Sequence, residues 1–171
     1  MKRAAAVLLA ASALAGCGYH VGGRADLLPS TLHTIAIPAF GNASPRYRLT
    51  SQLPAAITRE FLTRTRYRVV ANPNEADAVL YGTVKNYFSF PALSDQRTGR
   101  ASGVQVHVFL DVKLVERATG KVLWERQNYE FRGRYEIAVD QAQYFDESGT
   151  ALERLSREVA RQVVSSILEA F

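Results

Sequence analysis

Cys17 is the residue whose position most clearly predicts a chemical role, and it is the only cysteine in the 171-residue chain. Lys2 and Arg3 form a short basic start, the uncharged, mostly apolar stretch 4–13 follows, and Leu14-Ala15-Gly16 lead directly into Cys17. A basic start, an apolar segment of about 7–15 residues and small residues at the end are typical of a secretory signal peptide. A membrane-spanning helix needs about 20 apolar residues, so this segment is too short to span. The sequence therefore predicts export and cleavage before Cys17.

The sulfur of Cys17 predicts a covalent lipid anchor. Leu14-Ala15-Gly16-Cys17 resembles the lipobox of bacterial lipoproteins, in which the cysteine sulfur forms a thioether with diacylglycerol. With one cysteine, the chain cannot form a disulfide within itself. A mature lipoprotein cysteine carries about three acyl chains, and two membrane signals already give stable anchoring. Gly18 replaces the aspartate associated with inner-membrane retention, which favours the outer membrane.

No other residues form a pattern typical of catalysis or of cofactor binding. Three scattered histidines have no partner at metal-ligand spacing: His20, His33 and His107. Asp140, Asp146 and Glu147 are interpreted as a solvated acidic connector rather than a catalytic pair. The sequence contains no phosphate loop, nucleophile elbow or dinucleotide-binding glycine pattern. We therefore expect a protein that is not an enzyme, with no catalytic residues, no cofactor and no metal.

Arginine is the second residue type with a possible binding role, and it makes up 17 of the 21 basic residues. Arg97 and Arg100 stand three apart in the polar segment 91–103, and guanidinium groups match phosphate geometry well. A GC-rich genome would produce the same arginine bias, and a solvated loop would carry the same residues. Removing Lys2 and Arg3 lowers the net charge from +5 to +3 (21 − 2 = 19 basic against 16 acidic residues). That excess does not indicate nucleic acid binding.

The chain is predicted to consist of a signal peptide at residues 1–16, a lipidated tether at 17–30 and one domain at 31–171. Within the domain, the predicted order of strands and helices is β-α-β-β-β-β-α. Strands are expected at residues 34–40, 67–71, 78–90, 104–115 and 121–131. Ser51 is predicted to cap the first helix, which would place Pro54 in its first turn. Thr150 is predicted to cap the second helix, with Glu153 completing a capping box. We expect Gly82 to mark a bulge, Gly120 a hairpin turn and Gly133 the end of a strand.

Apolar periodicity predicts how these elements pack. Residues 104–114 alternate with period two, which places Val108 on a buried face and His107 on the outward face. The first helix has an apolar stripe at Leu49, Leu53, Ile57 and Phe61. The second has its stripe at Leu152, Leu155, Val159, Val163 and Ile167, with Glu153–Arg157 and Arg154–Glu158 pairs on the wet face. The expected fold class is α+β: one mixed or antiparallel sheet of about four to five strands, with two amphipathic helices packed on it.

Several motifs recur along the chain in a characteristic order: Cys17-Gly18-Tyr19-His20-Val21, Leu28-Pro29-Ser30, Thr34-Ile35-Ala36-Ile37, Tyr67-Arg68-Val69-Val70, Ala76-Asp77-Ala78-Val79-Leu80-Tyr81-Gly82 and Tyr144-Phe145-Asp146-Glu147 followed by Ala151-Leu152-Glu153-Arg154-Leu155. Together they resemble the LptE family of lipopolysaccharide-assembly lipoproteins. The resemblance implies an outer-membrane lipoprotein, tethered on the periplasmic side or inside a barrel lumen. Its implied partners are an LptD-type β-barrel and lipopolysaccharide.

The resemblance also implies a ligand site. The family's basic loop aligns with residues 96–100, so Arg97 and Arg100 are the candidate contacts for lipopolysaccharide phosphates. A second basic position of the family falls at residues 141–144, which hold no lysine or arginine. Arg132 and Arg134 could substitute for it or could be ordinary strand-end charges. An accessory lipoprotein of another envelope machine, such as a peptidoglycan synthase activator, is the alternative function.

Overall fold

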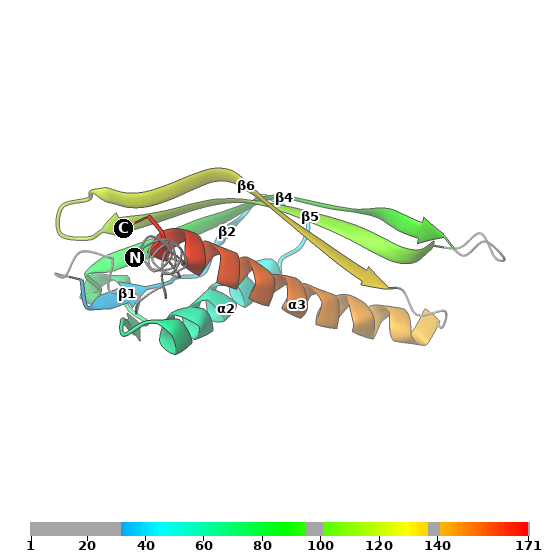
Figure 1. Ribbon diagram of the computed structural model, residues 1–171, viewed down its shortest axis with the longest axis horizontal. Helices are drawn as coiled ribbons and strands as arrows, with labels where there is room; N and C mark the ends of the chain where they lie inside the picture. The colour runs from blue at the N-terminus through cyan, green and yellow to red at the C-terminus, as the bar shows by residue number, and fades with distance from the viewer. Residues whose placement is uncertain (1–31, 95–100, 137–140, 171) are drawn as a thin grey trace, which may run out of the picture.

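The fold is a mixed β-sheet with two helices packed on one face (Figure 1). The computed structural model describes residues 32–94, 101–136 and 141–170. The elements in chain order are β1 (Thr34–Ala36), β2 (Gly41–Asn42), α2 (Leu49–Arg64), β3 (Arg68–Val70), the 3₁₀ turn η2 (Pro73–Glu75), β4 (Ala78–Ser94), β5 (Ala101–Glu116), β6 (Val122–Glu136) and α3 (Gln141–Leu168). The predicted α+β class is confirmed, with the two-residue strand β2 added to the expected order.

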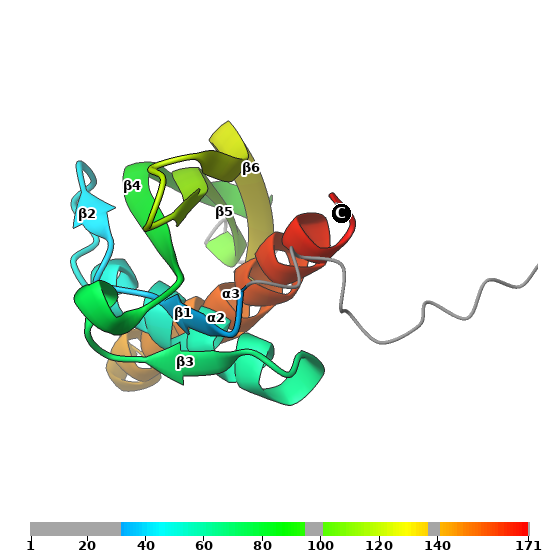
Figure 2. The same cartoon turned by 90° about the vertical axis from the view of Figure 1, so that its left-hand side faces the viewer.

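The sheet combines a short parallel part with a long antiparallel part. Its strands lie in the order β3-β1-β4-β5-β6, and β2 pairs with β4 beside this path. β1 is parallel to both β3 and β4, whereas β4, β5 and β6 are antiparallel neighbours. The three long strands and α3 extend along the molecule, while β1 and β3 lie near one end (Figures 1 and 2). The antiparallel strands therefore reach well beyond the parallel part of the sheet.

The apolar stripes that the sequence predicted form the core. All four stripe residues of α2 are fully buried, and so is the inward-facing Val108 of β5. The five stripe residues of α3 are at most 7% exposed. α2 packs against α3, and α3 also packs against β6. Both helices thus bury one face between each other and the sheet, as the periodicity indicated. None of the described helices is long and apolar enough to cross a membrane.

The predicted start of α2 was wrong. The helix begins at Leu49, and Ser51 lies inside it, where its hydroxyl donates backward to the Arg48 carbonyl. Pro54 is consequently interior, and its missing N–H would leave the Thr50 carbonyl without its helical donor. The backbone N–H of Phe40 donates to that carbonyl at 3.0 Å instead. A long-range hydrogen bond therefore compensates for the proline, and no local pattern encodes it.

The predicted start of α3 was also wrong. The helix begins at Gln141, so Gly149 and Thr150 lie inside it and most of the expected connector is helical. One glycine in a helix interior costs only about 1 kcal/mol relative to alanine, which tertiary packing readily offsets. The Glu153–Arg157 pair is present at 3.7 Å, but Glu158 pairs with Arg161 at 3.6 Å rather than with Arg154.

Two glycines have roles other than those predicted. Gly82 stays in regular register opposite Val112, and the nearest register shift of β4 lies between Val84 and Asn86. The ring of Phe40 occupies the space where a Cβ of residue 82 would project. Gly133 does not end its strand, because β6 continues to Glu136. The loop predicted at residues 91–103 is longer than the gap between the two strands, since β4 runs to Ser94 and β5 starts at Ala101.

Candidate functional site

The structure places only some of the residues that the sequence singled out. Three of them lie outside the described residues: Cys17, Arg97 and Arg100. The described strands reach the segment 95–100 from both sides, because Ser94 and Ala101 pair at the end of the β4–β5 hairpin. Arg132 and Arg134 lie in the second half of β6 and are both exposed. The site can therefore be built from β6 and the elements beside it.

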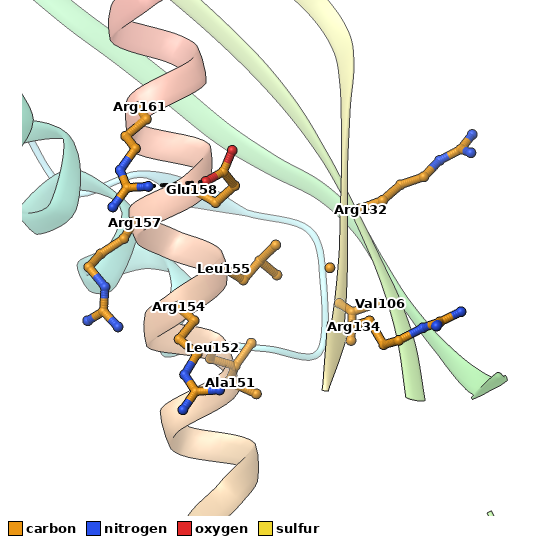
Figure 3. A pocket seen from close by; sticks show the side chains of 11 residues that line it. Val106, Arg132, Arg134, Ala151, Leu152, Arg154, Leu155, Arg157, Glu158 and Arg161 are labelled. Carbon is orange, nitrogen blue, oxygen red and sulfur yellow. Dashed lines mark ion pairs between the residues drawn. The ribbon is translucent and has the colours of Figure 1, made fainter. Parts of the chain in front are cut away.

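The pairing of β6 with β5 fixes which way its residues face. Arg132 lies opposite His107 on the outward face of the sheet, and Arg134 is two residues further on the same face. Gly133, between them, lies opposite the buried Val106 and faces inward. The arginine side chains accordingly point away from α3 (Figure 3). A Cβ on Gly133 would lie 3.0 Å from Cδ1 of Leu155, so the glycine lets α3 approach β6 closely.

A hollow of about 380 Å³ lies between β6 and α3, and we call it the arginine groove (Figure 3). Its residues are Val106, Arg132, Gly133, Arg134, Ala151, Leu152, Arg154, Leu155, Arg157, Glu158 and Arg161. Val106 and Gly133 form the sheet side of an apolar floor, and Ala151, Leu152 and Leu155 form the helix side. The volume lies within the range of about 300–1,000 Å³ that is usual for ligand pockets.

Five arginines and one glutamate form the rim of the arginine groove. Arg132 and Arg134 extend from β6 away from α3, and Arg157 extends from α3 on the side away from β6 (Figure 3). The guanidinium groups of these three residues therefore diverge. Arginine stems commonly cover apolar surface while the charged head stays in water. The stems thus widen the apolar walls, and the positive charges lie along the two outer edges.

The rim arginines differ in how far neighbouring carboxylates neutralise them. Arg132 donates to both carboxylate oxygens of Glu130, at 3.0 and 3.1 Å. Glu130 also contacts Nδ1 of His107 at 2.6 Å, and these two partners, Arg132 first, hold the pKa of Glu130 below its ordinary value. Within the described part of the chain, Arg134 and Arg154 form no ion pair. These two guanidiniums are the ones most available to an incoming anion.

The arginine groove combines arginine side chains with an apolar floor. Arginine stays protonated in proteins and donates hydrogen bonds without accepting any, so it binds carboxylates and phosphates. Among the residues that the structure describes, no three histidine, cysteine or acidic residues cluster closely enough to hold a metal ion.

Sequence reasoning missed half of this site. Arg154 and Arg157 were interpreted only as part of the wet face of a helix, and Arg161 was not singled out. Their spacing of three and four residues does place them along one stretch of helix surface, which was the available signal. Nothing local shows that this stretch lies near Arg132 and Arg134, because α3 approaches β6 only through packing at Gly133.

The described residues form a small α+β domain with an arginine-lined groove between β6 and α3. Solved structures share the fold. Lipoprotein B from Nitrosomonas europaea is 17% identical, with 89% of this chain and 96% of that one covered at a TM-score of 0.52. A proposed lipoprotein from Caulobacter crescentus is 16% identical, with 80% and 89% covered at 0.54. A protein from Xanthomonas campestris is 17% identical, with 83% and 87% covered at 0.52.

The family is identified by sequence. The model of the lipopolysaccharide-assembly family LptE matches residues 32–167, and the chain belongs to this family. None of the curated proteins matches the chain. The predicted membership in a lipoprotein family of lipopolysaccharide assembly is therefore confirmed.

Proposed function

We propose that this protein is an outer-membrane lipoprotein, acylated at Cys17, that plugs an LptD-type β-barrel and helps to deliver lipopolysaccharide to the outer leaflet. The observation that carries the proposal is the family match over residues 32–167, which includes every described strand and nearly all of α3. Residues 17–30 form the tether, which reaches at most about 3.3–3.6 Å per residue. The domain then works on the periplasmic side of the membrane or inside the barrel lumen.

Arg97 and Arg100 are the proposed contacts for lipopolysaccharide phosphates. Charge-assisted hydrogen bonds from arginine to phosphate are about twice as strong as neutral ones. The described surface supports this assignment, because the strands that flank these residues also lead toward the arginine groove: Gly103 of β5 pairs with Glu136 of β6, two residues beyond Arg134. The far half of β6 thus carries Arg132 and Arg134 together with Glu130 and Glu136.

The outward face of β4 and β5, near their β4–β5 hairpin, is the proposed contact surface for the barrel. Phe88 and Phe90 are 51% and 47% exposed, and Phe88 packs edge-to-face on Phe109 with ring centroids 5.9 Å apart. Exposed apolar groups gathered on one face mark a surface that a partner covers. We assign these phenylalanines to contact with the barrel wall.

The partner is tested by purifying the lipoprotein from detergent-solubilised outer membrane and identifying what accompanies it. We expect a large outer-membrane β-barrel in stoichiometric amount, and replacing both Phe88 and Phe90 by serine should reduce its yield. Replacing Tyr47, which is 79% exposed on another part of the surface, by serine is the matched control. Recovery of a peptidoglycan synthase in place of a barrel would support the alternative accessory function.

The ligand contacts are tested by reversing both charges, Arg97→Asp with Arg100→Asp. Two lost charge-assisted bonds, at about 1.5–3 kcal/mol each, should weaken binding of labelled lipopolysaccharide by tenfold or more. The difference in affinity between the variant and the wild type should shrink as the salt concentration rises, because salt ions screen exposed charges, with a Debye length of about 10 Å at 0.1 M. Unchanged binding at low salt would remove these two residues from the ligand site.

A further inference from the structure

We propose that the open edge of β6, beside the arginine groove, receives an extended segment of another protein as an added β-strand, and that acidic and apolar side chains alternate along this segment. The proposal goes beyond lipopolysaccharide assembly, and it depends neither on Cys17 nor on the ligand contacts. Four features of β6 and α3 carry it: an unpaired strand edge, a hollow that reaches this edge, the length of the hollow and its charge.

The edge of β6 is regular and unpaired. β6 is the last strand in the order of the sheet, so one of its two edges has no partner strand. From Tyr129 to Glu136 its residues pair one for one with β5, without a register shift. Among the described residues, the backbone of this stretch bonds to no element other than β5. Alternate residues of an edge strand direct their N–H and C=O groups outward, and these unpaired groups are a template for a further strand.

The opposite edge of the long strands is protected, whereas the edge of β6 is not. In the described residues, β4 pairs with β1 and β2 only as far as Val84, so its later part also has an open edge. That part contains Pro91 and two register shifts, one on each side of Leu93. Proline and irregular register prevent strand addition at an exposed edge. The stretch 129–136 of β6 contains neither, which fits a strand that another chain completes.

The arginine groove reaches this edge, because three consecutive residues of β6 line it: Arg132, Gly133 and Arg134. Successive side chains of a strand face opposite sides of the sheet, so a hollow confined to the inward face would be lined by alternate residues only. The side chains of Arg132 and Arg134 point away from α3 (Figure 3). The atoms that these two residues contribute to the groove therefore lie at or near the backbone. A segment in the groove would lie alongside the backbone of β6.

The length of the groove suits a short extended segment. Its lining residues on α3 run from Ala151 to Arg161, which corresponds to about 15 Å at a rise of about 1.5 Å per residue. About four or five residues of extended chain span the same distance. Every second side chain of the added strand would face α3, where Leu152 and Leu155 belong to the apolar floor. PDZ and PTB domains bind peptides by adding a strand to an exposed sheet edge in this way.

The charge of the groove decides which segment fits. Five arginines and one glutamate line it, and Arg134 and Arg154 form no ion pair among the described residues. Outward side chains of the added strand would lie beside Arg132 and Arg134, and cross-strand pairs of opposite charge are stabilising. Acidic residues therefore fit the outward positions, and apolar residues fit the inward ones. A second copy of this chain fits less well, because it would bring a second arginine-lined edge.

The experiment measures the binding of synthetic peptides to the intact lipoprotein by fluorescence anisotropy. The probe is a labelled peptide of about six residues, slightly longer than the groove, in which glutamate and valine alternate. Two further peptides carry backbone N-methyl groups, one on every glutamate and the other on every valine. Only alternate N–H groups of an added strand donate to its neighbour, so we expect one methylated peptide to bind about tenfold or more weakly and the other to bind like the parent.

The charge of the segment is tested with a peptide in which lysine replaces each glutamate. Arg134→Glu should weaken binding of the glutamate peptide by about fivefold and strengthen binding of the lysine peptide, since it reverses one cross-strand pair. The matched control is Arg59→Glu, the same change at an exposed position on α2, which should alter neither affinity. A variant that failed to fold would lose both peptides, so the opposite responses distinguish the charge effect from unfolding.

The remaining outcomes overturn the proposal. Equal binding of the two N-methylated peptides would refute strand addition, because a ligand held by charge alone is indifferent to which N–H groups are blocked. No detectable binding of the glutamate peptide would refute it as well, and equal binding of the glutamate and lysine peptides would refute the acidic character of the segment. A lipoprotein dimer that the peptide dissociates would assign the edge to a second copy instead. Each of these results would leave the proposed function standing, since that rests on the barrel that accompanies the purified lipoprotein.

Discussion

Asp77 shows how one side chain can join distant parts of the chain. Its carboxylate accepts hydrogen bonds from the backbone N–H groups of His33 and Thr34, both at 2.9 Å, and from the Thr34 hydroxyl at 2.8 Å. The backbone N–H of Asp77 in turn donates a hydrogen bond to the Thr34 carbonyl. The carboxylate therefore fixes the start of β1 beside the start of β4. This explains the structural use of the Ala76-Asp77-Ala78 motif.

Replacing Asp77 by asparagine should lower the free energy of unfolding by about 1.5–3 kcal/mol at pH 7, the range for hydrogen bonds to charged groups. These bonds, the one from the His33 N–H first, hold the pKa of Asp77 below 3.8 in the folded state. A depressed carboxyl pKa stabilises the protein above the unfolded-state pKa, and this contribution is lost as the pH falls through the folded-state pKa. Urea unfolding of both proteins should show the gap shrinking below about pH 4.

The control for this prediction is Glu169→Gln, at an exposed position near the end of α3. It removes a carboxylate without removing those bonds and should leave stability nearly unchanged. A gap for Asp77→Asn that widens in acid would contradict the linkage argument.

Gly82 is the second residue whose identity is set by a tertiary neighbour, the Phe40 ring. Gly82→Ala should destabilise the domain by about 1–3 kcal/mol, since the added methyl group overpacks a rigid ring contact. Thermal unfolding of Gly82→Ala, Phe40→Leu and the double variant measures the coupling between the two sites. Strict additivity of the two losses would show that the ring is not the obstacle.

At the scale of elements, β5 is the case in which pattern and structure agree best. All six residues of its inward face are at most 7% exposed: Val104, Val106, Val108, Leu110, Val112 and Leu114. The period-two pattern predicts the buried face correctly here because β5 is central, with a partner strand on each side and helices covering only one face. The ends of α2 and α3 were predicted less well, because contacts from other parts of the chain overrode the local capping signals.

Val108→Asp should unfold the domain. An unpaired carboxylate at a fully buried position costs several kcal/mol, comparable with a total stability of about 5–15 kcal/mol. The neighbouring change His107→Gln, on the outward face, removes one contact with Glu130 and should leave the fold intact. Circular dichroism distinguishes the two, and equal loss of signal in both would mean that the faces of β5 are assigned wrongly.

For the molecule as a whole, the proposed attachment to the membrane is through the sulfur of Cys17. The arginine groove and the phenylalanines of the outward face both belong to the far half of the long strands. A tether that holds the domain at the membrane would present both to partners there.

Cys17→Ala should leave an uncleaved and unacylated precursor, because the thioether must form on sulfur before the peptide bond is cut. Labelling cells with a radioactive fatty acid and determining the N-terminus of the product tests this. The Gly18→Ala variant, which keeps the sulfur, should incorporate label normally. A Cys17→Ala protein that still takes up label would exclude acylation at this residue.

The class of fold, the buried faces of α2, α3 and β5, and the family were all predicted correctly from the sequence. These depend on periodicity and on motif order, which are properties of the chain alone. The sequence also shows that the protein is rich in arginine, but it left open whether Arg132 and Arg134 contribute to ligand binding.

The position of the arginines of β6 relative to those of α3 could not be predicted from the sequence. Arg134 and Arg154 come from different elements, and they share a groove because Gly133 has no side chain to hold α3 away from β6. The same holds for Pro54, which the helix accommodates because Phe40 supplies the missing hydrogen bond. Contacts between residues far apart in sequence have no local signature, and they form only when packing brings the elements together.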